Sequence, residues 1–137
     1  MRDEDVVAFG FRDEAQARSF GSPAIPRTIR GFNVERVRKL GIRAAAREAL
    51  QRLKNAPEGF WIHFDVDVPD NDSMPAADND VPGGLSFGEV EETLRAMTFS
   101  GRAAGMNVTI FNPTIDPDGS LAQKIVDSIV GGVQGIR

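Results

Sequence analysis

Two aspartates spaced D-x-D close an apolar run and are the residues of this chain best suited to chemistry. Asp65 and Asp67 lie in residues 60–68, FWIHFDVDV. In a β-strand, residues i and i+2 share a face, so we expect the two carboxylates to lie close together. Carboxylates held that close repel each other unless a cation lies between them. The pair therefore predicts a site for a hard divalent ion, Mg²⁺, Ca²⁺ or Mn²⁺.

The same pattern has a structural alternative, in which D-x-D marks an acidic strand end that enters a solvated loop. His63 has the strand parity of the two aspartates and could join a metal site. A lone histidine within an apolar strand is more often a hydrogen-bonded core residue. We therefore expect Asp65 and Asp67 to be the metal ligands, with His63 outside the first shell.

A long irregular loop follows the aspartates and ends at a helix start. It contains the steps M-P-A at residues 74–76 and P-G-G-L-S-F at residues 82–87. Its charges Asp78 and Asp80 are expected to be solvated. Gly83 and Gly84 are expected to be turn residues rather than a phosphate cradle, because G-x-G-x-x-G is absent. With the D-x-D strand before it, this spacing resembles the ureohydrolase family, which includes arginase, agmatinase and formiminoglutamase.

Two further segments carry the resemblance. Residues 6–13, VVAFGFRD, look like the family's strand that ends in G-x-R, and residues 107–119, NVTIFNPTIDPDG, look like its V-x-E-x-N-P and D-P-D-G segment. The likeness covers roughly residues 6–130 but corresponds only to the C-terminal half of such an enzyme. It implies that residues 1–137 form a single α/β domain equivalent to that half.

The resemblance also implies a reaction. In the family, two bridged Mn²⁺ ions activate a water that attacks a guanidino or amidino carbon, and D-x-D supplies ligands that match Asp65 and Asp67. The remaining ligands come from G-G-D-H and D-x-H-x-D segments in the N-terminal half, and neither occurs here. We therefore expect manganese to bind weakly or partially and the chain to be inactive alone. No catalytic residue is assigned.

Two positions depart from the family pattern. Ile110 stands where V-x-E-x-N-P places the glutamate that anchors the substrate's guanidinium, so a charge-assisted hydrogen bond is lost. We interpret Ile110 as a strand-packing residue. At the D-P turn, Pro69 precedes Asp70 and Asn71 replaces the proline, which predicts an altered turn.

Two other function classes remain open. FDVDV also resembles the nucleophile motif of haloacid-dehalogenase-like phosphatases, although such enzymes need a downstream acidic pair where this chain has Asn112-Pro113. Alternatively, the chain is a non-catalytic interaction domain in which the aspartates are vestigial.

Composition narrows the choice of partners. The 137 residues carry a net charge of −4 with scattered Lys and Arg, which argues against nucleic acid. The absence of cysteine excludes disulfides and thiolate sites, and fits a cytoplasmic location. No apolar run reaches membrane-spanning length, and the start MRDED lacks a signal-peptide core.

Strand and helix patterns alternate along the chain. Strands are expected at residues 6–9, 60–68 and 106–111, with a brief extended piece at Thr28-Ile29. Helices are expected at residues 13–20, after a cap at Asn33, from Gly41 to about Asn55, after the S-x-x-E box of Ser86 and Glu89, and after a cap at Ser120.

This alternation predicts a three-layer α/β/α fold with a mostly parallel sheet, arginase-like but lacking the N-terminal strands. The near-continuous apolar run at residues 60–68 predicts a central strand buried on both faces. In the resembling fold, one neighbour of this strand comes from the N-terminal half. The chain is therefore expected to move residues 6–9 into the gap, to form a homo-oligomer, or to bind a complementing N-terminal half.

Overall fold

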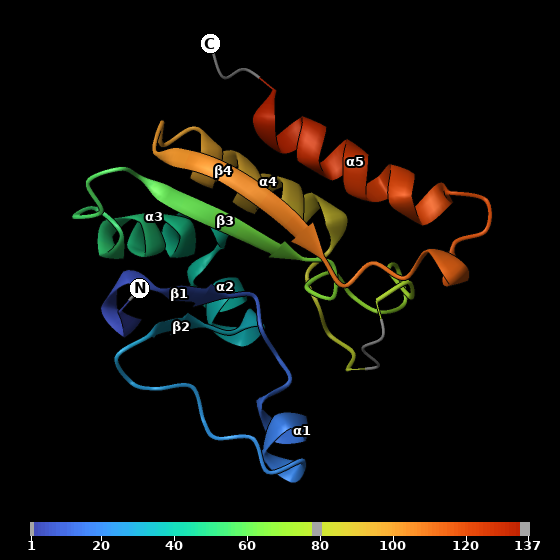
Figure 1. The fold of residues 1–137 in the computed structure, drawn as a ribbon, viewed down its shortest axis with the longest axis horizontal. Coiled ribbons are helices and arrows are strands. Elements are labelled where there is room, and N and C mark those ends of the chain that lie inside the picture. The colour runs from blue at the N-terminus through green and yellow to red at the C-terminus, as the bar shows by residue number, and fades with distance from the viewer. Residues whose placement is uncertain (1, 78–80, 135–137) are drawn as a thin grey trace.

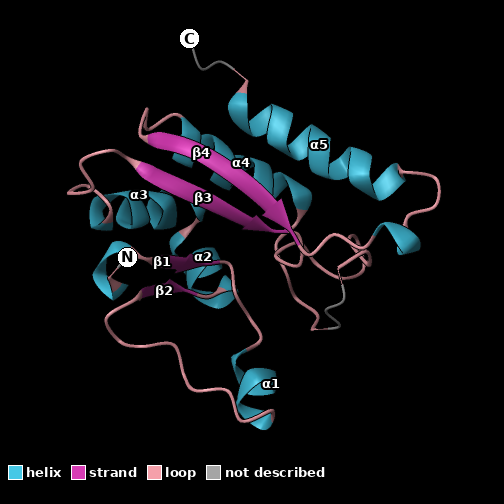
Figure 2. Ribbon diagram, in the orientation of Figure 1, coloured by secondary structure: helices cyan, strands magenta, loops and turns pink. Residues whose placement is uncertain are grey.

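The computed structural model describes residues 2–77 and 81–134, and strands alternate with helices along them (Figures 1 and 2). The strands are β1 (Val7–Phe9), β2 (Arg30–Phe32), β3 (Phe60–Asp65) and β4 (Ala103–Thr109). The helices are α1 (Glu14–Ser19), α2 (Val34–Leu40), α3 (Ile42–Arg52), α4 (Phe87–Thr98) and α5 (Ser120–Val133), with single 3-10 turns at Asp3–Asp5 and Pro113–Ile115.

The described strands form two parallel pairs rather than one sheet. β1 pairs with β2, and β3 pairs with β4. The α/β class and the parallel pairing are as the sequence predicts. The strand at residues 60–68 is flanked by β4 as expected, but it is not central, because its other edge has no strand partner among the described residues. The extended piece expected at Thr28-Ile29 is also displaced, since β2 begins at Arg30.

One face of the β3–β4 pair packs on helices and the other is open. Ile62 and Phe64 pack in the core with residues of α3 and α4, as Figure 1 shows for the helices behind the sheet. Trp61 and His63 point to the opposite face, where the Trp61 side chain is 62% exposed. The prediction of two-sided burial is therefore wrong for this strand: within residues 2–77 and 81–134, no helix layer covers that face.

The helices behind the sheets form where the local signals predict them. The side chain of Asn33 caps α2 by accepting a hydrogen bond from the amide of Arg36 at 3.0 Å. Next along the chain, α3 ends at Arg52, three residues before the expected Asn55. Its inward face is made of small side chains with no exposure, Ala45, Ala46 and Ala49. Small residues on this face let α3 lie close to both sheets.

The capping box predicted for α4 is confirmed, whereas the cap predicted at Ser120 for α5 is wrong. The amide of Glu89 donates to Ser86 Oγ at 3.2 Å, while the amide of Ser86 donates to Glu89 Oε2 at 2.7 Å. At α5, Ser120 makes no side-chain cap. The buried carboxylate of Asp116 instead accepts the amides of Leu121 and Ala122, at 2.9 and 2.8 Å. Its two oxygens satisfy two of the free amides at the start of this helix.

Candidate functional site

The two candidate metal ligands lie at the carboxyl end of β3, but only one is on the strand. β3 ends at Asp65, and Asp67 lies in the turn that follows. The amide of Val68 donates to the carbonyl of Asp65 at 3.1 Å, and the amide of Asp67 donates to Asp65 Oδ1 at 3.3 Å. The expectation that both aspartates share one strand face is therefore wrong. A tight turn after Asp65 brings the two aspartates together instead, and the Asp65 carboxylate accepts the amide of Asp67 within that turn.

The surroundings of Asp65 disfavour its charge. Partial burial raises the pKa of the Asp65 carboxyl, the nearby charge of Asp67 adds to that rise, and the amide of Asp67 and the imidazole of His63 oppose it. A desolvated carboxylate beside a second carboxylate is an arrangement that a cation would relieve. The raised pKa of Asp65 is thus what is expected for two neighbouring carboxylates with no cation between them.

His63 is held by a hydrogen-bonded chain on the open face of the sheet. Trp61 Nε1 donates to Asn107 Oδ1 at 2.7 Å, and Asn107 Nδ2 lies 3.0 Å from His63 Nδ1. Because the indole can only donate, the Asn107 oxygen must face it, so the amide NH₂ donates to His63 Nδ1. His63 Nε2 then carries the proton and donates to Thr109 Oγ1 at 3.3 Å. His63 is thus an exposed, hydrogen-bonded sheet residue, and the core role expected for it is wrong.

A backbone contact fixes the position of Trp61. The indole lies over Gly105, where a Cβ would come within 2.3 Å of Trp61 Cζ3. Any larger residue at this position would displace the ring and break the chain of hydrogen bonds that begins at its Nε1.

Asp70 organises the loop after the aspartates. Its carboxylate accepts the amide of Asp72 at 3.2 Å and that of Gly83 at 2.6 Å. These backbone hydrogen bonds, led by the one from Asp72, lower the pKa of Asp70. Gly84 packs directly on the Pro69 backbone, where a Cβ would lie 2.6 Å from its carbonyl carbon. Gly83, with φ at +86°, and Gly84 lie in an irregular part of the loop and not in a turn, whereas Asp78 and Asp80 lie outside the described residues.

Arg12 ties β1 to the loop that carries Asp67. Its Nη1 donates to the carbonyl of Asp67 and its Nε to that of Val81, both at 2.7 Å, and its Nη2 reaches the carbonyl of Pro69 at 3.4 Å. Sequence reasoning gave Arg12 no role. The available signal was its place at the end of the G-x-R segment, directly after an apolar strand.

Ile110 is not a strand-packing residue, which corrects the expectation for it. β4 ends at Thr109, and Ile110 follows with φ at +67° and 54% of its surface exposed. Positive φ is rare for a β-branched side chain. The next residue, Phe111, bridges Ala77, and the amide of Asn112 donates to the carbonyl of Ala76 at 2.7 Å. The positive φ of Ile110 thus turns the backbone from the end of β4 toward the loop that contains Ala76 and Ala77.

The described residues alone do not complete a metal centre. Within residues 2–77 and 81–134, no group of three or more His, Asp or Glu side chains is placed to hold an ion. His63 therefore does not form a three-ligand metal site with Asp65 and Asp67 in the described part of the chain. In the same residues, no helix is both long and apolar enough to cross a bilayer.

Comparison with known proteins shows which family this chain resembles in sequence. Residues 1–131 match the Arginase family. The arginase of Brucella melitensis is 28% identical over 96 residues, which cover 70% of this chain and 31% of that protein. The formimidoylglutamase of Bacillus subtilis is 21% identical over 134 residues, covering 98% of this chain and 42% of the relative.

A solved structure supports the same fold. The arginase from Bacillus caldovelox superimposes with a TM-score of 0.78 at 22% identity, over 100% of this chain and 45% of that protein. The chain thus spans less than half the length of these relatives. By the match over residues 1–131, this chain belongs to the arginase family.

Proposed function

We propose that this chain supplies part of the metal centre of a ureohydrolase, in which Asp65 and Asp67 are manganese ligands. The family reaction is hydrolysis of a C–N bond in a guanidino or amidino compound. The observation that carries the proposal is the turn at the carboxyl end of β3, which brings a partly desolvated carboxylate against a second one. In α/β folds, ligands collect beyond the carboxyl ends of parallel strands.

The donor set suits manganese chemically but is too small to hold it well. Two carboxylates leave most coordination positions to water, and the described residues add no third ligand. The residues present do not fit a binuclear centre, so no hydrolytic step is assigned to this chain alone. We infer that the chain is inactive by itself and that the other ligands come from another polypeptide segment.

The substrate side of the site also lacks the carboxylate that the resemblance assigns to it. Ile110 occupies the position of the glutamate that the resemblance assigns to guanidinium binding, and its side chain is exposed beside the turn into the loop. An aliphatic group there offers no charge-assisted hydrogen bond, worth about 1.5–3 kcal/mol. Binding of a guanidino substrate should be weak even when the metal ligands are complete.

Of the two alternative functions, one is disfavoured and one remains open. Membership of the arginase family argues against the phosphatase hypothesis. The interaction-domain hypothesis stays open, because two aspartates at a strand end can persist without metal. A cytoplasmic location also stays a prediction.

Calorimetry with Mn²⁺ tests the proposal. The chain should bind Mn²⁺ weakly, in roughly the millimolar range, and Asp67→Ala should abolish the heat of binding. Asp72→Ala is the matched control, because Asp72 is an exposed aspartate of the same loop and should leave binding unchanged. If Asp67→Ala and Asp72→Ala bind like the unmodified chain, the aspartate pair is not the site.

Urea release from arginine and agmatine tests the second half of the proposal. With Mn²⁺ present, the purified chain should release no urea above background. Turnover that Asp65→Ala abolishes would contradict the inference that the chain is inactive alone, because it would require a complete ligand set within these residues.

A further inference from the structure

Residues 27–54 hold most of the positive charge of this chain. They contain nine of its sixteen Lys and Arg residues but only two of its twenty Asp and Glu residues, Glu35 and Glu48. Nine positive and two negative charges give this segment a net charge of +7, within a chain whose net charge is −4. The segment runs from the loop before β2 through α2 and α3, so the fold decides which of these charges lie together.

Several of these charges surround an open hollow on the surface, which we call the arginine hollow. Its volume is about 510 Å³. The lining residues are Arg27, Thr28, Arg30, Glu48, Gln51 and Arg52. They come from the loop before β2, the first residue of β2 and the last part of α3. Figure 1 shows the start of β2 and the end of α3 on the same side of the molecule, away from the arrowheads of the strands. The arginine hollow thus lies at the opposite end of the strands from Asp65.

The loop that carries Arg27 is fixed against α3. Thr28 is held on two sides, because its hydroxyl donates to Asp3 Oδ2 at 2.6 Å and its carbonyl accepts from Arg52 Nη2 at 3.0 Å. The wall of the hollow is therefore formed before any ligand binds. A preformed wall lowers the entropy that a ligand must spend on ordering it.

One carboxylate is shared by two guanidinium groups at the hollow. Arg30 Nη2 and Arg36 Nη2 donate to the same oxygen of Glu48, Oε2, at 3.0 and 3.1 Å. The two guanidinium groups also lie over the ring of Phe32, at 5.4 and 4.7 Å from its centroid, which holds them in place. Glu48 therefore balances one of these two positive charges and leaves the other.

Two further arginines have donors to spare. In residues 2–77 and 81–134, the Arg27 side chain makes no hydrogen bond and no ion pair. Arg52 uses Nη2 for the carbonyl of Thr28, and no carboxylate of the same residues pairs with it. Because a guanidinium has five N–H donors and no acceptor, the arginine hollow offers more donors than its own acceptors use.

We propose that the arginine hollow binds a small inorganic phosphate anion with two or more negative charges, such as pyrophosphate. Guanidinium groups bind phosphate oxygens through paired hydrogen bonds, and here they come from a loop, a strand and a helix. Donors from three segments suit the tetrahedral oxygens of a phosphate better than the planar oxygens of a carboxylate. The volume lies in the range of small-molecule sites, roughly 300–1,000 Å³. The proposal uses neither Asp65 nor Asp67 and does not rest on the proposed function.

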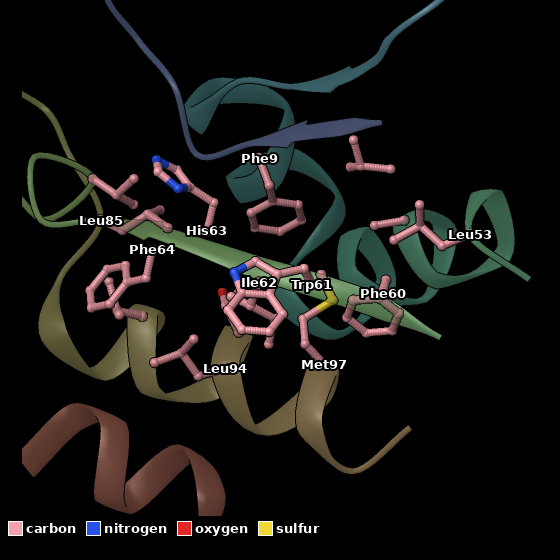
Figure 3. Close-up of a pocket in the computed structure, with 15 residues that line it drawn as sticks. Phe9, Leu53, Phe60, Trp61, Ile62, His63, Phe64, Leu85, Leu94 and Met97 are labelled. Carbon is pink, nitrogen blue, oxygen red and sulfur yellow. The ribbon is translucent and has the colours of Figure 1, made fainter. Parts of the chain in front are cut away.

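The lining of the hollow favours an inorganic anion over a nucleotide. For comparison, the apolar pocket beside β3 in Figure 3 is lined by side chains such as Phe9, Trp61 and Leu94. Among the described residues that line the arginine hollow, no aromatic or large aliphatic side chain is present to hold a base.

Calorimetry with pyrophosphate, at low salt and without added metal, tests the proposal. The unmodified chain should bind with a Kd of roughly 0.1–1 mM, because exposed charges are screened by solvent and salt. In amide NMR spectra, the signals of Thr28, Gln51 and Arg52 should shift during the titration. Arg27→Gln removes a side chain that supports nothing else and should weaken binding by roughly tenfold.

A variant with the opposite effect makes the test sharper. Glu48→Gln removes the carboxylate that competes for Arg30 and Arg36, and should tighten pyrophosphate binding by roughly threefold or more. A damaged fold would weaken binding instead, so this gain separates a change in the site from a change in stability.

Two controls fix the location. Arg43→Gln removes the same charge from α3, nine residues before Arg52 and roughly 13 Å along the helix axis, and should bind as the unmodified chain does. Asp67→Ala should also leave pyrophosphate binding unchanged, so this test and the manganese measurement fail independently.

Four results would overturn the proposal. The first is that pyrophosphate produces neither heat nor amide shifts. The second is that Arg43→Gln weakens binding as much as Arg27→Gln, which would mean that the positive charge of the whole segment attracts the anion. The third is that citrate, a tricarboxylate of similar charge, binds as tightly as pyrophosphate. The fourth is that ADP binds more tightly than pyrophosphate, which would assign the hollow to a nucleotide.

Discussion

At the scale of single residues, the backbone of Ile110 carries a conformation that its side chain disfavours. Its φ of +67° lies in the left-handed region, where an L-residue with a Cβ costs roughly 1–2 kcal/mol. The side chain is 54% exposed, so little burial compensates for that cost. Such strain persists where the surrounding structure determines the backbone, and here it lies at the substrate-side position of the proposed site.

Replacing Ile110 by glycine should therefore stabilise the protein. Ile110→Gly removes the Cβ from a left-handed position, and the free energy of unfolding should rise by about 1 kcal/mol. Urea unfolding followed by circular dichroism measures the change. The control is Val108→Gly, an exposed β-branched residue of the same segment that lies in regular β4, and it should lower stability. Destabilisation by both changes would mean that Ile110 is not strained.

Single residues also show where the sequence is informative. Asp65 and Asp67 could be singled out because their type and spacing carry the chemistry, whatever the local backbone. Their joining by a turn rather than a strand face could not be predicted, since one hydrogen bond from the amide of Val68 decides it. The role of Arg12 depends on carbonyls of Asp67 and Val81, which are more than fifty residues away, so no local pattern indicates it.

At the scale of elements, the loop after β3 depends on one carboxylate. Asp70 accepts amides from both ends of the loop, and these bonds hold its pKa below the ordinary value. A carboxyl group with a lowered folded-state pKa contributes stability that is present above its unfolded pKa. That contribution is lost as the pH falls through the folded pKa.

Asp70→Asn should thus matter at neutral pH and not in acid. At about pH 7 the variant should be less stable than the unmodified chain. The difference should begin to shrink below about pH 4, the ordinary pKa of an aspartate, and should be lost as the pH falls through the lower pKa of the folded state. Urea unfolding across this pH range checks it. Asp72→Asn, an exposed change in the same loop, should show little difference at either pH. A gap for Asp70→Asn that persists in acid would show that the charge is not responsible.

Helix α5 depends on Asp116 in a similar way. The carboxylate is buried and accepts two amides of the first turn. Asp116→Ala leaves both amides without this partner and should lower the free energy of unfolding by about 1–2 kcal/mol. Asp127→Ala, on the exposed side of α5, should cost less than about 0.5 kcal/mol. Equal losses in chemical denaturation would contradict the capping role.

The elements themselves were largely readable from the sequence, and the exceptions have a common cause. Asn33 and the Ser86–Glu89 box cap helices through contacts within three residues, which a sequence pattern displays. The cap by Asp116 acts over five and six residues and passes through a turn, so the local sequence pattern indicates the nearer Ser120 instead. The apolar run of β3 predicts two-sided burial, but among the described residues β3 has a strand partner on one edge only and Trp61 on its open face is exposed.

At the scale of the whole molecule, the two strand pairs meet through few direct contacts. A shared core of α3 and α4 residues supports both pairs, and Figure 1 shows β1–β2 beside β3–β4 with the helices behind. Besides this core, Arg12 provides hydrogen bonds from the β1 side to the loop after β3. The alignment of the two strand pairs at their carboxyl ends should therefore depend on the Arg12 side chain.

Removing the guanidinium of Arg12 should loosen one pair relative to the other. Arg12→Met keeps the side-chain length but leaves three carbonyls without their charged donor, and should cost about 2 kcal/mol or more of local stability. Native-state hydrogen exchange should then become faster at the β1–β2 amides of Ala8 and Gly10. The β3–β4 amides of Ile62 and Phe64 should keep their protection.

The matched control is Arg43→Met, which removes an arginine whose side chain is 84% exposed and paired only with Glu92 in the described structure. An exposed ion pair contributes roughly 0–1 kcal/mol, so exchange in this variant should stay near that of the unmodified chain. An equal acceleration of exchange across all four strands in Arg12→Met would contradict the prediction. It would mean that the two strand pairs unfold as one cooperative unit, held together by the shared helices, and that the Arg12 hydrogen bonds at their carboxyl ends are not needed for their alignment.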